Sequence, residues 1–200
     1  MIENEILKLF PDPVLKYKLD DYKNFNKDLE KYIYNLYEED TIGIERSNRG
    51  GWHSKNFNLS EENSIQKKFA IKIQEYILNC FQNMGWKTKD KNIRIKEMWA
   101  IINKQEDFNI THTHPNNILS SAYYVKAPKN CGDFIAENSN LAKRHLYPEI
   151  ENKNEFNADI ARIKVSEGDL LLFPAYLPHQ VSKNESGEDR IVISFNVDIK

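Results

Sequence analysis

The spacing of apolar residues changes part-way along this chain, and that change limits the folds it can adopt. Up to about residue 85 they recur every three or four positions, as in helices. From Ile93 onward they fall in eight short segments with strand composition, separated by turn residues. No helical stretch is interleaved among these segments, so alternating βαβ units are excluded. The pattern predicts an antiparallel sandwich or barrel backed by helices.

Two helices are predicted before the strands. The first runs from Asp21 to Glu38, with Asp20 or Asp21 as its N-cap. The second begins at Ser60 and ends before Gly85, because glycine is a favoured residue just after a helix.

The segment SNRGGWHSKNF (47–57) separates these helices, and its Gly50-Gly51 pair predicts a turn. It is either a structural loop anchored by an aromatic side chain or a substrate-side loop folded over a pocket. His53 in this loop and the distant His145 have no partner at ligand spacing, so we expect both to be loop histidines rather than metal ligands.

The predicted strands are 93–103, 108–114, 119–125, 132–137, 161–165, 169–174, 179–181 and 190–199. The polar stretch 138–159 is expected to leave the sheets as an irregular excursion. At 200 residues the chain suits one domain (1–200), in which 1–92 is helical support and 93–200 is the β core.

Composition narrows the class of protein. A net charge of −2 argues against a nucleic-acid or membrane-surface binder. Cys80 and Cys131 lie in dissimilar settings without a CxxC motif, which favours free thiols and a reducing, intracellular compartment. Neither a leader peptide nor an apolar run of membrane-spanning length is apparent, so we expect a soluble protein.

Three histidines are the first candidates for a site. His112 and His114 are two residues apart at the end of a predicted strand, where side chains at i and i+2 share a face. His179 begins another strand after a proline-bounded turn. Two close ligands and a distant third can hold a metal on a rigid sheet, with open positions for substrate. Imidazole suits iron, zinc and copper alike, so the histidines do not name the metal.

Arg190 is the second candidate. Alternation along RIVISFN places Arg190, Val192 and Ser194 on one face of the strand. A permanently charged guanidinium that points inward needs an anion, preferably one gripped through two parallel hydrogen bonds. A carboxylate-bearing co-substrate would meet that need.

These motifs together resemble a known family. The order of THTH (with His112 and His114), SAYYV, GDLLLFPAYLPH (ending at His179) and RIVISFN (from Arg190) is similar to that of the 2-oxoglutarate and Fe(II)-dependent oxygenases. The resemblance spans about 93–198 and is greatest to prolyl-hydroxylase-like members and to phage and marine-bacterial members. It implies a double-stranded β-helix, which is a cupin-like jelly roll, in the cytoplasm of a bacterium or a phage-infected host.

The resemblance also implies cofactors and a reaction. Fe(II) would be the metal, and 2-oxoglutarate and O2 the co-substrates. Oxidative decarboxylation of 2-oxoglutarate to succinate and CO2 would accompany hydroxylation of a second substrate. That prime substrate, a peptide or a small molecule, is not identified by the sequence.

Residue roles follow from the same resemblance. His112 becomes the first iron ligand and His179 the distal one. Arg190 holds the distal carboxylate of 2-oxoglutarate, Tyr124 assists it, and Ser194 lies on the same face. Asn103 and Trp99 share a face of the preceding strand and are expected to line the pocket.

His114 departs from the family pattern, which has Asp or Glu at this position. Either three histidines hold the metal, or a carboxylate from elsewhere completes the set, for which Asp133 and Glu137 are candidates without a spacing argument. Two other functions therefore stay open. One is a three-histidine iron dioxygenase that does not use 2-oxoglutarate, and the other is a catalytically silent jelly-roll binding protein.

Overall fold

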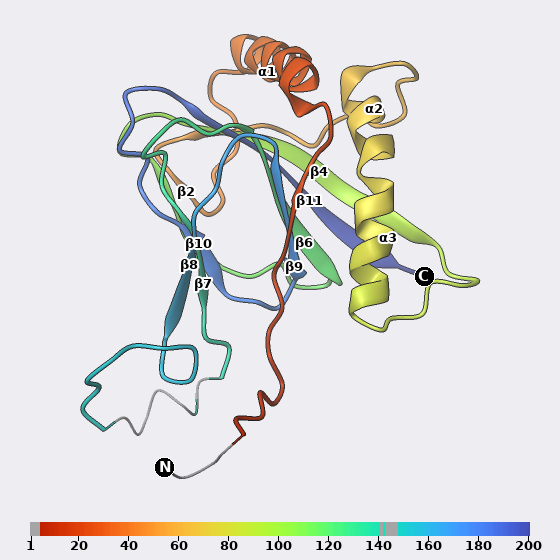
Figure 1. Cartoon of the computed structure of the whole chain (residues 1–200). Helices are drawn as coiled ribbons and strands as arrows, with labels where there is room; N and C mark the ends of the chain where they lie inside the picture. The colour runs from red at the N-terminus through yellow and green to blue at the C-terminus, as the bar shows by residue number, and fades with distance from the viewer. Residues whose placement is uncertain (1–4, 141, 143–147) are drawn as a thin grey trace.

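The computed structural model describes residues 5–140, 142 and 148–200, and it shows two facing β-sheets with helices on one side (Figure 1). The helices are α1 (Tyr22–Glu39), α2 (Ile65–Lys72) and α3 (Gln74–Asn83). The strands are β1 (Leu15–Lys18), β2 (Asn48–Arg49), β3 (Trp52–His53), β4 (Ile93–Asn103), β5 (Phe108–His112), β6 (Leu119–Lys126), β7 (Phe134–Glu137), β8 (Ile160–Ile163), β9 (Asp169–Pro174), β10 (His179–Val181) and β11 (Arg190–Ile199).

Both sheets are antiparallel. The larger has the order β1-β9-β6-β11-β4-β3 and the smaller has the order β2-β5-β10-β7-β8. Strands that follow one another along the chain, such as β4 and β5 or β9 and β10, lie in opposite sheets. Two sheets wound together in this way form a double-stranded β-helix, or jelly roll, as predicted.

The two faces of the larger sheet contact different parts of the interior. On one face, Ile191, Ile193 and Phe195 of β11 pack with α1, α2 and α3 in the main apolar core. On the other face, Val192 joins a smaller apolar cluster between the sheets, and Arg190 and Ser194 line a cavity there. The predicted alternation of β11 is therefore confirmed, and it directs every second side chain away from the helices.

The helices differ in detail from the prediction. Asp21 occupies the N-cap position of α1, but its backbone is left-handed (φ 52°) and its side chain makes no capping bond. The second predicted helix begins later, at Ile65, where the Ser64 side chain accepts a hydrogen bond from the backbone N–H of Lys67. It is also divided into α2 and α3 at Ile73, where ψ rises to −5°.

All eight predicted strands are present, and three more were missed. The missed strands are β1, β2 and β3, of which β2 and β3 have two residues each. They pair with β9, β5 and β4, respectively. Because such short segments carry little periodicity of their own, only pairing with distant strands defines them. The first 92 residues thus supply sheet edges as well as helices.

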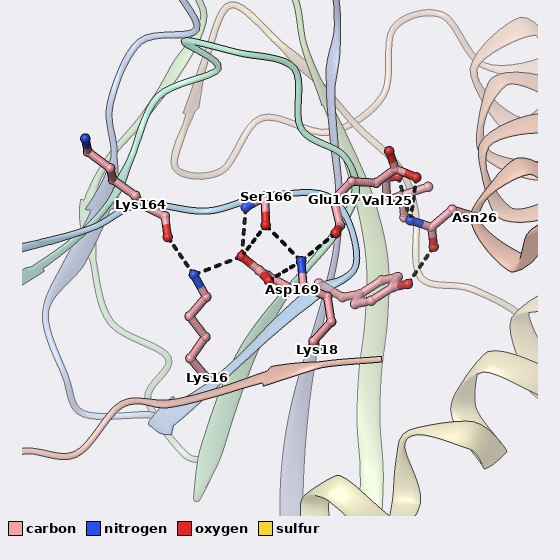
Figure 2. Close-up of polar contacts among 9 residues, drawn as sticks. Lys16, Lys18, Asn26, Val125, Lys164, Ser166, Glu167 and Asp169 are labelled. Carbon is pink, nitrogen blue, oxygen red and sulfur yellow. Dashed lines mark hydrogen bonds and ion pairs between the residues drawn. The ribbon is translucent and has the colours of Figure 1, made fainter. Parts of the chain in front are cut away.

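A buried carboxylate fastens β1 to β9. Asp169 is 1% exposed, and its carboxylate forms ion pairs with Lys18 at 2.6 Å and with Lys16 at 3.0 Å (Figure 2). The backbone N–H of Ser166 also donates to this carboxylate, at 2.7 Å. Burial alone would raise the pKa of Asp169, but these hydrogen bonds lower it below its ordinary value. Nearby, Asn26 of α1 donates to the backbone carbonyl of Val125 on β6.

Both cysteines are free and buried. In the described part of the excursion 138–159 there is no strand, and His145 lies outside the described residues. No helix in the described ranges has the length and hydropathy that crossing a membrane requires.

Candidate metal and anion site

The three histidines converge between the sheets. His112 ends β5, and His179, which begins β10, is paired directly with it across the smaller sheet. The ring centroids of these two lie 4.3 Å apart. His114 follows the strand, where its backbone N–H donates to the carbonyl of Ala175 at 2.9 Å. One ring nitrogen from each histidine lies within 4.8 Å of the other two, which is a spacing that one metal ion can bridge.

Hydrogen bonds orient two of these rings. His112 Nδ1 contacts the carbonyl of Ile110 at 2.8 Å, and His179 Nδ1 contacts the carbonyl of Leu177 at 2.9 Å. A carbonyl only accepts, so Nδ1 carries the proton and the lone pair of Nε2 is left for a metal. Burial lowers the pKa of all three rings, of His114 to about 4 and of His179 to about 3. The site therefore presents neutral imidazoles, the form that binds metals.

No carboxylate joins the histidine cluster within the described ranges. Glu137 accepts hydrogen bonds from Thr111 and Gln180, the immediate neighbours of His112 and His179. Because neighbours along a strand face opposite ways, these contacts place Glu137 on the outer face of the sheet. Asp133 instead pairs with Arg162 at 3.9 Å. Both carboxylate candidates are thus separate from the cluster, and His114 occupies the third position.

The other end of the site is a buried guanidinium. Arg190 is 0% exposed, and its Nη1 donates to the backbone carbonyls of Cys131 and Ser182. Its Nε and Nη2 have no partner in the described structure. The Tyr124 hydroxyl and Asn103 Nδ2 are also buried and unpartnered, and Asn103 is the cross-strand partner of Arg190. These donors together suit a carboxylate, since unmade buried hydrogen bonds cost free energy.

Glycine at 132 allows the guanidinium to lie where it does. The backbone at Gly132 is left-handed (φ 90°), and a Cβ there would lie 2.7 Å from Arg190 Nη1 and 2.5 Å from the carbonyl of Ser182. Any other residue would therefore be strained and would displace Arg190.

One cavity of about 690 Å³ joins the two ends. The predicted pocket residues Trp99, Ser194, Asn103 and Tyr124 all line it. Ser194 is the cross-strand partner of Trp99, whose ring lies 6.0 Å from that of His114.

The loop 47–57 is both anchored by an aromatic side chain and part of the cavity wall. Trp52 is buried and donates through Nε1 to the carbonyl of Asp40 at 2.6 Å. His53 lines the cavity and stacks on Trp99, with centroids 5.5 Å apart. His53 is outside the histidine cluster, in line with the expectation that it is not a ligand. It does line the cavity, because β3 pairs with β4 and carries it inward.

The polar cavity residues that sequence reasoning missed include Glu97, Asn117 and Asn196. Alternation could have found two of them. Glu97 is two residues from Trp99 on β4, and Asn196 is two residues from Ser194 on β11. Asn117 lies in a loop and gave no such signal.

The sequence of this β core matches one protein family. A family model described as "Putative 2OG-Fe(II) oxygenase" covers residues 97–196. The chain belongs to this family. No curated protein sequence matches the chain.

Solved oxygenase structures share the fold at low identity. A prolyl-4-hydroxylase from Pseudomonas putida has a TM-score of 0.65 and 11% identity, with 94% of this chain and 93% of that one covered. HygX from Streptomyces hygroscopicus, with nickel, 2-oxoglutarate and hygromycin B bound, has a TM-score of 0.64 and 10% identity, with 94% of this chain and 83% of that one covered. A Trichoplax adhaerens prolyl hydroxylase, in complex with a hypoxia inducible factor peptide, has a TM-score of 0.64 and 14% identity, with 92% of this chain and 83% of that one covered.

Fe(II) and 2-oxoglutarate, the metal and co-substrate of 2OG-Fe(II) oxygenases, fit the two ends of this cavity. Three neutral imidazoles form a donor set that Fe(II) accepts. The unpartnered donors of Arg190 and Tyr124 suit a carboxylate of 2-oxoglutarate.

Proposed function

We propose that this protein is an Fe(II)- and 2-oxoglutarate-dependent dioxygenase that hydroxylates a C–H bond of a peptide or small molecule. His112, His114 and His179 are the proposed iron ligands. The observation that carries the proposal is a single cavity with a cluster of neutral imidazoles on one wall and an unsatisfied buried guanidinium at one end. The whole chain, 1–200, is proposed to act as one domain.

The proposed reaction balances as 2-oxoglutarate + O2 + R–H giving succinate + CO2 + R–OH. One oxygen atom enters succinate and the other enters the product. Bound iron supplies the activation of O2, which amino-acid side chains cannot perform.

The chain's own residues bind and orient the reactants. Arg190, held through Nη1, offers Nε and Nη2 to the distal carboxylate of 2-oxoglutarate. Tyr124 and Asn103 add further donors, and burial raises the pKa of Tyr124, so its hydroxyl stays protonated. Val192 and Phe173 also line the cavity and help to exclude water.

The test separates iron binding from 2-oxoglutarate binding. His179→Ala is expected to lose tight Fe(II) binding, whereas His53→Ala, which removes a cavity histidine outside the cluster, keeps one iron per chain. Arg190→Ala is expected to keep iron and to weaken 2-oxoglutarate binding by about 2–5 kcal/mol, or roughly 30-fold or more. Arg190→Lys restores this only partly because an ammonium lacks the planar fork. Normal iron content in His179→Ala would contradict the ligand assignment.

His114 decides between the proposed function and a second candidate. Three neutral ligands leave Fe(II) with its full +2 charge, which strengthens its attraction for the 2-oxoglutarate dianion. His114→Ala should lose iron affinity, and His114→Asp should retain iron. Among the described residues no carboxylate joins the cluster, which also favours a three-histidine dioxygenase in which Arg190 binds the substrate's own carboxylate. Oxygen uptake without 2-oxoglutarate would favour that candidate, and succinate formation would favour the first. If the protein binds no Fe(II) and shows neither of these activities, it is a silent binding protein.

A further inference from the structure

The unpartnered polar atoms of the cavity differ in type from one end to the other. Around Arg190 they are donors, from Arg190, Asn103 and Tyr124. At the other end two of them are acceptors, the amide oxygens Oδ1 of Asn196 and Asn117. Positions 190 and 196 lie on one face of β11 and are separated by about 20 Å of strand. A molecule of 2-oxoglutarate held by Arg190 does not span that length, so the acceptors are left for another ligand.

The orientation of the Asn196 amide follows from its partner. Asn196 is 3% exposed, and its Nδ2 donates to Glu97 Oε2 at 3.1 Å. A carboxylate only accepts, so the nitrogen must face Glu97 and the oxygen must face away from it. In the part of the chain that the structure describes, Asn196 Oδ1 is therefore a buried acceptor without a donor, which costs free energy until a ligand satisfies it.

The same reasoning orients Asn117. Its Nδ2 donates to the backbone carbonyls of Pro115 at 3.1 Å and His114 at 3.4 Å, which leaves Oδ1 buried and without a partner among the described residues. The next residue, Ile118, donates its N–H to the carbonyl of Val197, so Asn117 lies beside the Asn196 end of β11. The contact with His114 also places this acceptor next to the proposed iron site.

A negative charge accompanies the two amide oxygens. Glu97 is partly buried, is the cross-strand partner of Asn196 and lines the cavity. Within the described ranges Glu97 forms no ion pair. Besides Arg190, two cationic side chains line the cavity: Lys55, which is paired with Asp40 at 3.0 Å, and Arg46, which is exposed. Trp99, whose Nε1 is a donor without a partner in the described structure, lies beside the histidine cluster, with its ring 6.0 Å from that of His114.

We propose that Glu97, Asn196 and Asn117 bind a cationic hydrogen-bond donor of the prime substrate, a primary ammonium or a guanidinium group. The inference rests on the proposed function, since it names the class of molecule that the iron site would hydroxylate. Three acceptors match the three donors of an ammonium, and the carboxylate supplies the opposite charge. An anionic or purely apolar substrate would leave these acceptors unsatisfied, which selects against it.

The test uses small probes that differ in their head group. The protein is first loaded anaerobically with Fe(II) and 2-oxoglutarate, and the metal-to-ligand charge-transfer band reports that this site is formed. Calorimetry then measures the Kd of n-butylammonium, n-butylguanidinium, n-butanol and butyrate at constant ionic strength. We expect the two cations to bind at least tenfold more tightly than butanol and butyrate.

Three variants connect the preference to the named carboxylate. Glu97→Gln keeps the shape and removes the charge, and it should abolish the cation preference. Glu97→Asp keeps the charge and should retain part of the preference. Glu75→Gln, an exposed glutamate on α3, is the matched control and should behave as wild type.

The outcomes separate this inference from the proposed function. If the charge-transfer band forms but cations bind no better than butanol, or Glu97→Gln keeps the preference, the inference is wrong and the proposed function stands. If wild type gives no band, the proposed function fails and the inference fails with it.

Discussion

Removing the Tyr124 hydroxyl should change stability and 2-oxoglutarate binding in opposite directions. The hydroxyl is fully buried with no hydrogen-bond partner in the described structure. An unsatisfied buried polar group costs about 1–3 kcal/mol, so Tyr124→Phe should raise the free energy of unfolding of the ligand-free protein by about 1 kcal/mol. For a chain of this length that corresponds to an increase in Tm of about 2–4 °C.

The same substitution should weaken 2-oxoglutarate binding. A hydrogen bond to a charged group contributes about 1.5–3 kcal/mol, so the Kd should rise roughly 10- to 150-fold. Thermal unfolding of the ligand-free protein gives the first quantity. Anaerobic titration of the Fe(II)-loaded protein with 2-oxoglutarate gives the second.

Tyr123 supplies the matched control because it is the neighbouring tyrosine with a partner. Its hydroxyl donates to Asn26 Oδ1 on the helix side of the sheet. Tyr123→Phe should therefore lower Tm and leave the Kd for 2-oxoglutarate unchanged. If Tyr124→Phe also lowers Tm and does not change this Kd, Tyr124 is a structural residue and the assignment of the anion end is refuted.

Two further predictions concern the support of the site and of the sheet. Gly132→Ala should displace the Arg190 guanidinium and weaken 2-oxoglutarate binding at least tenfold with iron content unchanged, whereas Gly187→Ala, where a Cβ meets nothing within 4 Å, should have no effect. Equal Kd values in both variants would contradict the close approach at Gly132. Asp169→Asn should lower the free energy of unfolding at pH 7 by about 1–3 kcal/mol. Because the folded-state pKa of Asp169 lies below its ordinary value, the carboxylate stabilises the fold above about pH 4 and this contribution disappears as pH falls further. Urea unfolding at pH 7 and pH 3 should show the difference from wild type shrinking in acid, and a constant difference would refute the assignment.

Much of the β core could be predicted from the sequence because strand signals are local. Alternation along β11 was enough to place Arg190 and Ser194 opposite Ile191 and Ile193. The meeting of the three histidines was also predicted, from a pair at i and i+2 and a jelly roll that brings distant strands together, although His114 itself lies just beyond the end of β5. Their roles as iron ligands stay a proposal.

Helix boundaries were less predictable. The apolar spacing from Ile65 to Met84 continues through Ile73, so nothing in the period indicates the break between α2 and α3. N-capping decided where α2 begins, because the Ser64 side chain, and not that of Ser60, accepts a hydrogen bond from the backbone N–H of Lys67 in the first turn.

What only the tertiary structure decided is which polar groups have partners. The sequence by itself determined the class of fold, the faces of the long strands and the candidate ligands, because each depends on residues a few positions apart. Whether Arg190 Nε, Tyr124 OH or Asn196 Oδ1 is satisfied depends on atoms that arrive from other strands and loops. The donor end and the acceptor end of the cavity therefore exist only in the folded chain, because hydrogen-bond satisfaction is a property of long-range packing and not of local pattern.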